Sequence, residues 1–207
     1  MENAKKTIGV LAGGFSSEYA ISIASGKTAF DAFTKAGYRT LFIELNKEGF
    51  FHEGQKVQLE DLNLSYVFNI IHGAPGEDGH VSGMLEVLGI PHSTCSTFES
   101  ALTFNKAECN ALLRLSGFAV PRGELFTAFP GQSYFSEWRY PVFVKPNRSG
   151  SSFGVSKVED PQGLEAAFDH ALSEDVQVLV EEVIQGTEVG SVALSSKVDF
   201  ASGQTNA

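Results

Sequence analysis

Short apolar runs that alternate with helical segments constrain the fold of this chain more than any other feature. The run 7–14, TIGVLAGG, reads as a buried strand, and a helix follows that Ser17 caps and Gly37 stops. Two further buried strands are predicted at 38–45 and 66–73. Strands that alternate with helices favour a parallel α/β sheet in this part of the chain.

The pattern changes near residue 100. A short helix at 80–89 and a strand or extended turn at 90–95 complete the first part. Residues 97–117 then have the spacing of two consecutive helices. In the second of these helices, four apolar residues share one face: Ala107, Ala111, Leu112 and Leu115.

After Pro121 the chain reads as a series of strands interrupted by one helix. Asp160 caps that helix, Pro161 lies in its first turn, and four residues face inward: Leu164, Phe168, Ala171 and Leu172. The predicted strands are 123–129, 140–146, 153–158, 176–184 and 188–196. Strands in a run with few helices favour an antiparallel sheet, so an α+β unit should follow the α/β unit.

The charge of the chain argues against general nucleic-acid binding. The 207 residues are 43% hydrophobic, which is enough for a core, and carry a formal net charge of -10. Phosphate backbones are held mainly by basic patches. Cys95 and Cys109 form no C-x-x-C pair, which is typical of free thiols in a reducing cytoplasm. No stretch resembles a signal segment or is long enough to span a membrane, so we expect a cytoplasmic protein.

The stretch 12–18, AGGFSSE, places a glycine pair between the first strand and the first helix. This suggests a dinucleotide site, with Glu44 as a ribose-binding acid at the end of the second strand. The G-x-G-x-x-G fingerprint is missing, however, because the glycines fall at 9, 13 and 14. Glu18 either binds an ammonium group or is a first-turn carboxylate favoured by the helix dipole.

The stretch 72–79, HGAPGEDG, directly follows a predicted buried strand. The carboxyl end of a parallel strand usually opens onto a ligand-binding crevice, and His72 lies there. Glu77 and Asp78 could simply cap the next helix. The spacing of the eight residues favours a functional turn.

The stretch 145–154, KPNRSGSSFG, combines a lysine at the end of an apolar strand with a loop of small residues. Five of the six residues from Ser149 to Gly154 are small, more than a simple turn needs. Backbone N–H groups and hydroxyls in such a loop can surround phosphate oxygens. The strand that follows brings in three acids, which are either surface carboxylates or part of a region suited to clasping an adenine ring: Glu181, Glu182 and Glu188.

Together these segments resemble the D-alanine–D-alanine ligases of the ATP-grasp superfamily. Five blocks occur in order, and HGAPGEDG matches the H-G-x-x-G-E-D-G signature at every fixed position. The blocks are LAGGFSSEYAIS, HGAPGEDGHVSG, FNKAECNALL, PVFVKPNRSGSSFGVSKV and VEEVIQGTEV. The resemblance implies an N-terminal Rossmann-like parallel-sheet domain (1–100), a central ATP-grasp subdomain with an antiparallel sheet (101–194), and a truncated or disordered tail (195–207).

The resemblance also implies the reaction and the residues that hold ATP. The carboxylate of a first D-alanine attacks the γ-phosphate, and the amine of a second D-alanine then displaces phosphate from the acyl phosphate. The dipeptide D-alanyl-D-alanine is a peptidoglycan precursor. The implied nucleotide residues are Lys106 and Lys145 at the phosphates, Ser152 and Gly154 in the covering loop, Glu181 with the backbone of Val183 and Ile184 at the adenine, and Glu188 at the ribose.

At the first substrate, the resemblance implies that Glu18 binds the ammonium group and is tied to Ser151 by hydrogen bonds. His72 lies beside the reacting carboxyl group, and Glu77 holds His72 in position without contacting the substrate. One departure is serious, because the family continues beyond this point with a C-terminal lobe that supplies the Mg²⁺ ligands. We therefore assign no metal ligand and expect the chain alone to be inactive.

Two alternatives remain open at this stage. The chain could come from a D-alanyl-D-lactate or D-alanyl-D-serine ligase, since the second-substrate residues are missing, or it could be a non-catalytic fragment that binds nucleotide. The resemblance further favours a homodimer formed through the N-terminal domain.

Overall fold

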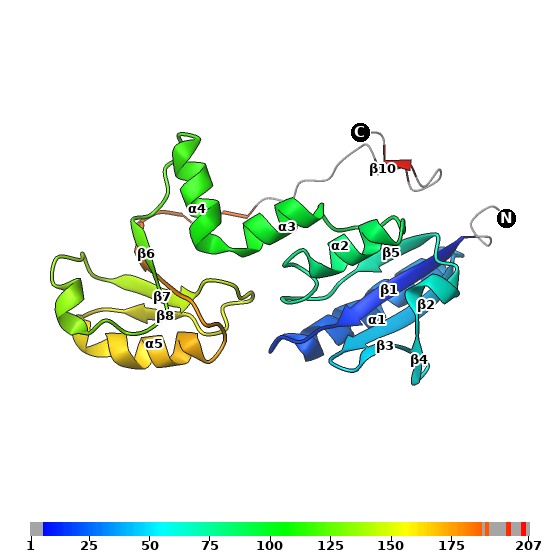
Figure 1. Cartoon of the computed structure of the whole chain (residues 1–207), viewed down its shortest axis with the longest axis horizontal. Coiled ribbons are helices and arrows are strands. Elements are labelled where there is room, and N and C mark those ends of the chain that lie inside the picture. Colours follow the sequence, from blue (N-terminus) through cyan, green and yellow to red (C-terminus); the bar gives the residue numbers. More distant parts are fainter. Residues whose placement is uncertain (1–5, 188, 191–197, 200–203, 206–207) are drawn as a thin grey trace. The chain divides into compact units, whose positions relative to one another are not determined.

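The computed structural model describes residues 6–187, 189–190, 198–199 and 204–205 (Figure 1). The described residues divide into two compact units. The first unit comprises those of Met1–Thr97 and Thr187–Ala207, and the second comprises Phe98–Gly186.

The sheet of the first unit is built around β1 (Thr7–Gly13), in which every residue is buried. β1 pairs in parallel with β2 (Arg39–Asn46) on one side and with β5 (Tyr66–Asn69) on the other. The helix α1 (Tyr19–Lys35) packs closely on this sheet at Gly26, where an added Cβ would lie 2.6 Å from the Cβ of Ala12. The predicted parallel core of the unit is confirmed.

The sheet as a whole is mixed, however, and the expectation of a parallel sheet was wrong at one edge. β3 (Gly49–His52) pairs antiparallel with β2, and β4 (Gln55–Val57) pairs antiparallel with β3, which gives the order β4-β3-β2-β1-β5. Glu53 and Gly54 connect β3 and β4, both with positive φ, of 51° and 77°. Two successive positive φ angles suit the right-handed twist of a tight hairpin.

The ends of α1 agree with the sequence pattern at one terminus only. Gly37 follows the helix with φ 86°, as expected of a glycine stop. At the start, the N-cap residue is Glu18 rather than Ser17, and it makes no side-chain cap.

β5 ends at Asn69, four residues earlier than predicted, because its side chain turns the chain. The Asn69 Oδ1 accepts from the Ile71 N–H (3.2 Å), and its Nδ2 donates to the Gly76 carbonyl (3.0 Å). The predicted short helix is α2 (His80–Val87). The segment 90–95 is the extended turn rather than a strand, with a single parallel bridge from His92 to β5.

The second unit holds a four-stranded antiparallel sheet of order β6-β9-β7-β8, which confirms the predicted type of sheet. Figure 1 shows α5 lying along this sheet. The strands are β6 (Gly123–Phe126), β7 (Val142–Pro146), β8 (Ser156–Val158) and β9 (Val178–Glu182).

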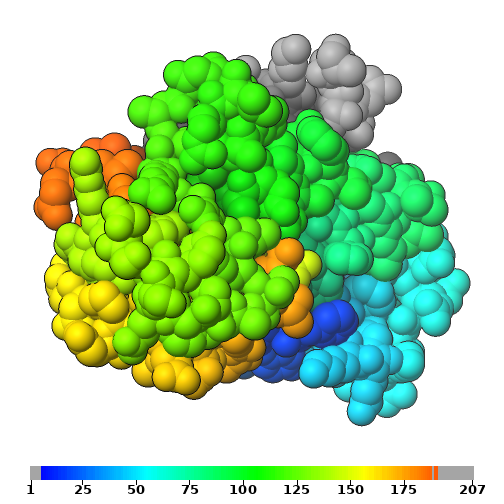
Figure 2. Space-filling model, turned by 60° about the vertical axis from the view of Figure 1, so that its left-hand side comes forward, coloured from blue at the N-terminus to red at the C-terminus, as the bar shows by residue number. Residues whose placement is uncertain are grey.

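The helix over this sheet begins as predicted. Asp160 caps a 3₁₀ turn (Pro161–Gly163) by accepting from the Gln162 N–H at 2.9 Å, and α5 (Leu164–Leu172) follows. Three of the four expected inward residues of α5 are buried, and Leu172 packs against the same core. In Figure 2, α5 is part of the yellow to light-orange surface of this unit. The core also contains Phe135, at the end of a 3₁₀ turn (Gln132–Phe135).

Two consecutive helices, α3 (Thr97–Phe104) and α4 (Lys106–Leu115), occupy the predicted segment. The apolar face predicted for the second helix does not enter a core. No residue of α4 is buried, and Leu115 is 87% exposed. The first turn of α4 contacts the rest of this unit through polar groups instead, since the Ala107 N–H and the Lys106 Nζ both donate to Asn147.

At the C-terminal end, β10 (Val198–Asp199) and β11 (Gln204–Thr205) pair antiparallel. Most of the predicted strand 188–196 lies outside the described residues. In the part of the chain that is described, no helix combines the length and the apolar character needed to cross a membrane.

Candidate functional site

Lys145 lies at the carboxyl end of β7, in register with Leu179 of β9. Its ammonium forms an ion pair with the Glu181 carboxylate, which is only 4% exposed. The second carboxylate oxygen of Glu181 accepts from the Asn110 Nδ2 of α4 at 2.6 Å. A buried acid held by a neighbouring amide fixes the position of the lysine ammonium at the end of the sheet.

The loop after β7 has an unusual backbone. Ser151 and Ser152 have φ 44° and 63°, the left-handed region that non-glycine residues occupy rarely. Gly154 has φ 72°, and an added Cβ there would lie 2.6 Å from the Pro146 ring. Inside the loop, the Phe153 N–H donates to the Gly150 carbonyl at 3.1 Å. Strained left-handed residues are often retained where they shape a ligand site.

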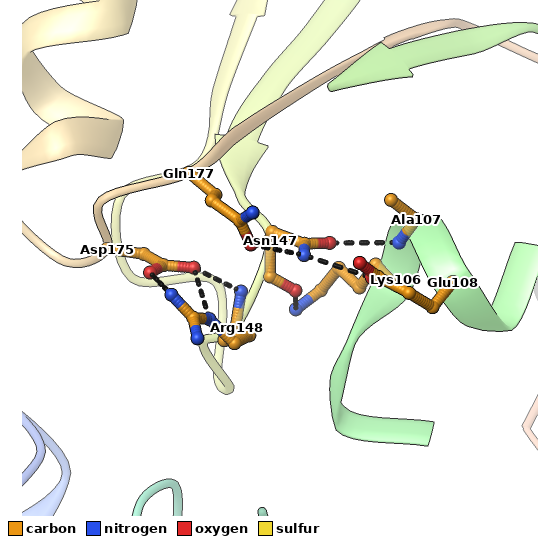
Figure 3. A network of polar contacts seen from close by, with 7 residues as sticks. All are labelled: Lys106, Ala107, Glu108, Asn147, Arg148, Asp175 and Gln177. Atoms are coloured by element: carbon orange, nitrogen blue, oxygen red, sulfur yellow. Dashed lines mark hydrogen bonds and ion pairs between the residues drawn. The ribbon is translucent and has the colours of Figure 1, made fainter. Parts of the chain in front are cut away.

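The predicted first lysine is attached to this loop. Lys106 is the first residue of α4, and its Nζ donates to the carbonyl oxygens of Ser149 (2.6 Å) and Asn147 (3.3 Å). Lys106 therefore lies against the base of the loop that carries Ser152 and Gly154, and Figure 3 shows its contact with Asn147.

The predicted adenine segment follows β9. The Val183 N–H donates to the Pro141 carbonyl at 3.3 Å, so this amide serves the fold and is not a free donor for a ligand. The Ile184 side chain is 66% exposed, and Figure 2 shows the segment around residue 185 as orange atoms at the surface. Glu188 lies outside the described residues.

In the first unit, the predicted segments 12–18 and 72–79 contact each other at Ser16. The Ser16 Oγ donates to the His72 carbonyl at 2.8 Å and accepts from the Glu18 N–H at 3.3 Å. The Gly73 backbone lies so close that an added Cβ would be 3.1 Å from the Glu18 Oε2. Glu18 and His72, which are far apart in the sequence, are thereby brought together.

Both groups are poorly satisfied by the protein itself. Glu18 is 3% exposed, and among the described residues no group donates a hydrogen bond to its carboxylate or forms an ion pair with it. The His72 Nε2 is buried and has no hydrogen-bond partner among the described residues. Buried polar atoms are nearly always paired, so the unpaired His72 Nε2, on a turn whose backbone lies close to the Glu18 carboxylate, indicates a place for a polar ligand.

The turn 72–79 is held by its own acid. The Glu77 Oε2 accepts from the Gly73 N–H at 2.8 Å, and the Glu77 N–H donates to the Gly73 carbonyl at 3.0 Å. Glu77 therefore fixes the turn that carries His72. The Asp78 Oδ1 accepts from the His80 N–H at 3.1 Å, at the start of α2. This agrees with the alternative that Asp78 caps the helix.

The Glu44 carboxylate, the acid of the dinucleotide alternative, is used within the fold. Its Oε1 accepts from the Tyr19 hydroxyl at 2.6 Å. This hydrogen bond, together with burial, raises the pKa of Tyr19 to about 12. A carboxylate engaged in this way is less available to a ribose.

Comparison with known proteins matches these features to one family. The family described as "D-ala D-ala ligase C-terminus" matches residues 128–203. A D-alanine–D-alanine ligase of Flavobacterium johnsoniae is 34% identical over 93% of this chain and 65% of its own length. A putative D-alanine–D-lactate ligase of Streptomyces coelicolor is 32% identical over 98% of this chain and 67% of its own length. The chain belongs to the D-alanine–D-alanine ligase family of the ATP-grasp superfamily.

Solved structures of this family share the fold. The D-alanyl-alanine synthetase A of Vibrio cholerae superposes with a TM-score of 0.77 at 31% identity, covering 88% of this chain and 61% of that chain. The VanG D-Ala:D-Ser ligase of Enterococcus faecalis gives a TM-score of 0.72 at 30% identity, covering 87% and 63%. The chain spans just under two thirds of the length of the first curated relatives, 65%, 62% and 63%.

The ligand-binding roles of all the predicted site residues stay predictions, and two of them can be addressed least. Glu18 and Ser151 belong to different units, so their hydrogen-bonded link is not tested. For Mg²⁺, the described residues contain no group of three or more His, Cys, Asp or Glu side chains that could hold a metal ion. They therefore do not fit a metal site on their own.

Sequence reasoning missed four polar residues that hold the ligase-like segments in place: Ser16, Asn69, Asn110 and Asn147. Ser16 lies inside the G-G-x-S-x-E stretch, so the motif itself contained the signal. The three asparagines contact residues outside their own elements. Asn69 contacts Gly76, Asn110 contacts Glu181, and Asn147 contacts Ala107. A single sequence gives no signal for such partners.

Proposed function

We propose that this chain carries the first-substrate unit and part of the nucleotide site of an enzyme that joins two D-alanines at the expense of ATP. The observation that carries the proposal is the lysine-bearing loop of the second unit. Lys106 and Lys145 are both held at the base of a strained glycine and serine loop, in a chain that belongs to a ligase family. Fixed cations and backbone donors are what phosphoryl transfer requires of a protein.

The second unit fits the phosphates of ATP. The two ammonium groups neutralise phosphate oxygens, and the exposed loop residues Ser151 and Ser152 close over them. The adenine lies against the segment after β9, where the exposed Ile184 offers apolar surface and Glu181 a buried acid. When bound, ATP supplies the phosphoryl group that activates the substrate carboxylate, whereas the protein positions and neutralises charge.

The first unit fits the first D-alanine. The buried Glu18 carboxylate pairs with the substrate ammonium group, and this interaction compensates for the desolvation of both charges. The unpaired His72 Nε2 lies beside the substrate carboxyl group, and Glu77 keeps the turn in place. Positioning of the carboxylate for attack on the γ-phosphate is the contribution of this unit.

A second candidate concerns the second substrate. The match to a putative D-alanine–D-lactate ligase and the superposition on a D-Ala:D-Ser ligase favour a depsipeptide or D-serine product as the alternative. The first-substrate and ATP residues are the same in either case. The remaining parts of the proposal follow from the family: Mg²⁺ bound by groups outside the described residues, a homodimer formed through the N-terminal domain, and a role in peptidoglycan synthesis in the cytoplasm.

The test of the nucleotide site is the change Lys145→Ala. We expect ATP binding to weaken about tenfold or more, because a charge-assisted contact to phosphate is lost. The unfolding midpoint should also fall, because the buried Glu181 carboxylate then keeps only the hydrogen bond from Asn110, so ATP affinity is the deciding measurement. Lys157→Ala is the matched control, because Lys157, an exposed residue of β8, forms a surface ion pair with Glu159, just after that strand.

The measurements are isothermal titration with ATP and magnesium and thermal unfolding of each variant. Unchanged ATP affinity in Lys145→Ala, together with a large loss of stability, would show that Lys145 is a structural residue.

A further inference from the structure

The first turn of α4, which carries Lys106, lacks a cap from its own N-cap residue. Asn105 occupies that position but makes no side-chain cap, and its Nδ2 donates to the Ala101 carbonyl at 2.6 Å instead. Helix starts leave backbone N–H groups that need acceptors. The Ala107 N–H finds one 40 residues away in the sequence, in the Asn147 Oδ1, at 2.9 Å (Figure 3).

Asn147 is fully buried, and its side chain can take only one orientation there. Its Oδ1 faces a backbone N–H, which can only donate. Its Nδ2 donates to the Glu108 Oε2 (3.2 Å) and to the Gln177 Oε1 (3.0 Å), both of which accept. A flipped amide would place donor against donor and acceptor against acceptor.

The backbone of Asn147 holds the same helix start. Its carbonyl accepts from the Lys106 N–H at 3.2 Å and from the Lys106 Nζ at 3.3 Å. Its N–H donates to the Gln177 carbonyl at 2.9 Å, which ties the segment to the start of β9. One buried residue therefore links the helix that begins with Lys106, the base of the loop, and the strand that leads to Glu181.

We propose that Asn147 is a positioning residue that caps α4 from the base of the loop and thereby fixes the place of the Lys106 ammonium. The inference rests on the proposed role of Lys106 in binding ATP. Asn147 itself is buried under the loop and acts through Lys106. The next residue, Arg148, is held by Asp175 through two side-chain hydrogen bonds (2.7 and 3.2 Å). The two residues at the base of the loop, Asn147 and Arg148, are therefore both held in place by side-chain contacts.

The cap can be tested without nucleotide. In Asn147→Ala the Ala107 amide should lose most of its protection from hydrogen exchange. The double variant Asn147→Asp/Glu108→Gln keeps an acceptor for that amide, replaces the facing carboxylate by an amide that can donate, and should retain the protection. Gln177→Ala removes one bond to the Asn147 Nδ2 but leaves the cap intact, and is the matched control. Equal protection of the Ala107 amide in Asn147→Ala and in the unaltered chain would overturn the cap.

The effect on ATP is tested by a double-mutant cycle in the full chain. Asn147→Ala should weaken ATP binding about tenfold, as expected when the hydrogen bonds that place a charged group are lost. In a Lys106→Ala background it should have no further effect, because residues that act through one another are not additive. Gln177→Ala should lower stability but leave ATP affinity within about twofold, since the cap is kept.

The outcomes separate the two proposals. Equal losses of affinity from Asn147→Ala with and without Lys106 would overturn the positioning role. If Lys106→Ala itself leaves ATP binding unchanged, the proposed nucleotide function of Lys106 fails, and the exchange data alone decide whether Asn147 caps α4. Circular dichroism shows whether each variant is folded, and Asn147→Asp/Glu108→Gln provides the second variant if Asn147→Ala is not.

Discussion

Charged side chains at the candidate site are paired in one unit and unpaired in the other. In the second unit, Lys145 rests on Glu181 and Lys106 rests on loop carbonyls. In the first unit, Glu18 is buried, and no described residue pairs with its carboxylate. An acid in such a place costs folding free energy unless a ligand supplies the missing cation, which is why we propose that Glu18 binds the substrate.

The change Glu18→Gln tests this assignment, because it keeps the shape of the side chain and removes its charge. The unfolding midpoint should not fall, since no partner within the protein is lost. In an assay-competent form of the protein, kcat/KM for the first D-alanine should fall about 10- to 100-fold, the value of a lost charge-assisted contact, with ATP affinity unchanged. Steady-state kinetics with varied D-alanine measures this, and unaltered kinetics would remove Glu18 from the site.

Among the elements, α1 shows how closely the layers of the first unit approach. Gly26 is buried on the helix face that contacts β1, where nothing larger than a hydrogen atom fits against Ala12. The glycine therefore serves packing, although glycine within a helix is unfavourable by about 1 kcal/mol relative to alanine. The close approach brings the start of α1, and with it Glu18, against the carboxyl ends of the strands.

We expect Gly26→Ala to destabilise the first unit despite the better helix propensity of alanine. Overpacking of a tight contact costs about 1–3 kcal/mol, whereas the gain in helix propensity is only about 1 kcal/mol. The cost therefore exceeds the gain over most of its range. Thr28→Ala, at an exposed position of the same helix, gains propensity without a clash and should be neutral or slightly stabilising. Chemical denaturation of both variants measures the difference, and an increase in stability for Gly26→Ala would contradict the close packing.

Local patterns predicted the elements better than their partners. Strand β1, the stop of α1 at Gly37 and the Asp160 cap follow from residues that act within one turn of the chain, so the sequence contains them. The hairpin of β3 and β4 was missed because its strands are short, and only the Glu53–Gly54 pair marks the turn. The cap from Asn147 could not be predicted, because its partner lies 40 residues away.

The candidate site divides in the same way. The motifs named Glu18, His72, Lys106 and Lys145, but what each of them contacts depends on tertiary structure. The α4 face that holds Leu115 shows the converse, since its periodicity predicts a buried stripe and the structure leaves it exposed. Periodicity reports that a face is apolar, and the packing partner has to come from elsewhere.

At the scale of the whole molecule, the chain holds two units and spans just under two thirds of the length of its first curated relatives. Acyl phosphate chemistry gathers several negative oxygens, which requires a divalent cation and exclusion of water. The described residues contribute lysines and loop donors but no cluster of metal ligands.

We therefore expect this 207-residue chain alone to make no dipeptide. The measurement is incubation of the purified chain with ATP, magnesium and D-alanine, followed by assays of phosphate and of D-alanyl-D-alanine. A form that carries the remaining third of the family's length is the positive control. Dipeptide that scales with the concentration of this chain would show that the metal site lies within it.

The resting contacts of the two lysines have a consequence for selectivity among anions. A ligand that approaches Lys145 must compete with the Glu181 carboxylate already bound to it, and one that approaches Lys106 must replace the carbonyls of Asn147 and Ser149. A monovalent anion offers one contact in exchange for one that is lost, so it gains little by binding. A triphosphate offers several oxygens to both ammonium groups and to the loop at once, and its gain grows with each contact. With the proposed nucleotide role, we therefore expect these internal contacts to favour a polyphosphate over a monovalent anion.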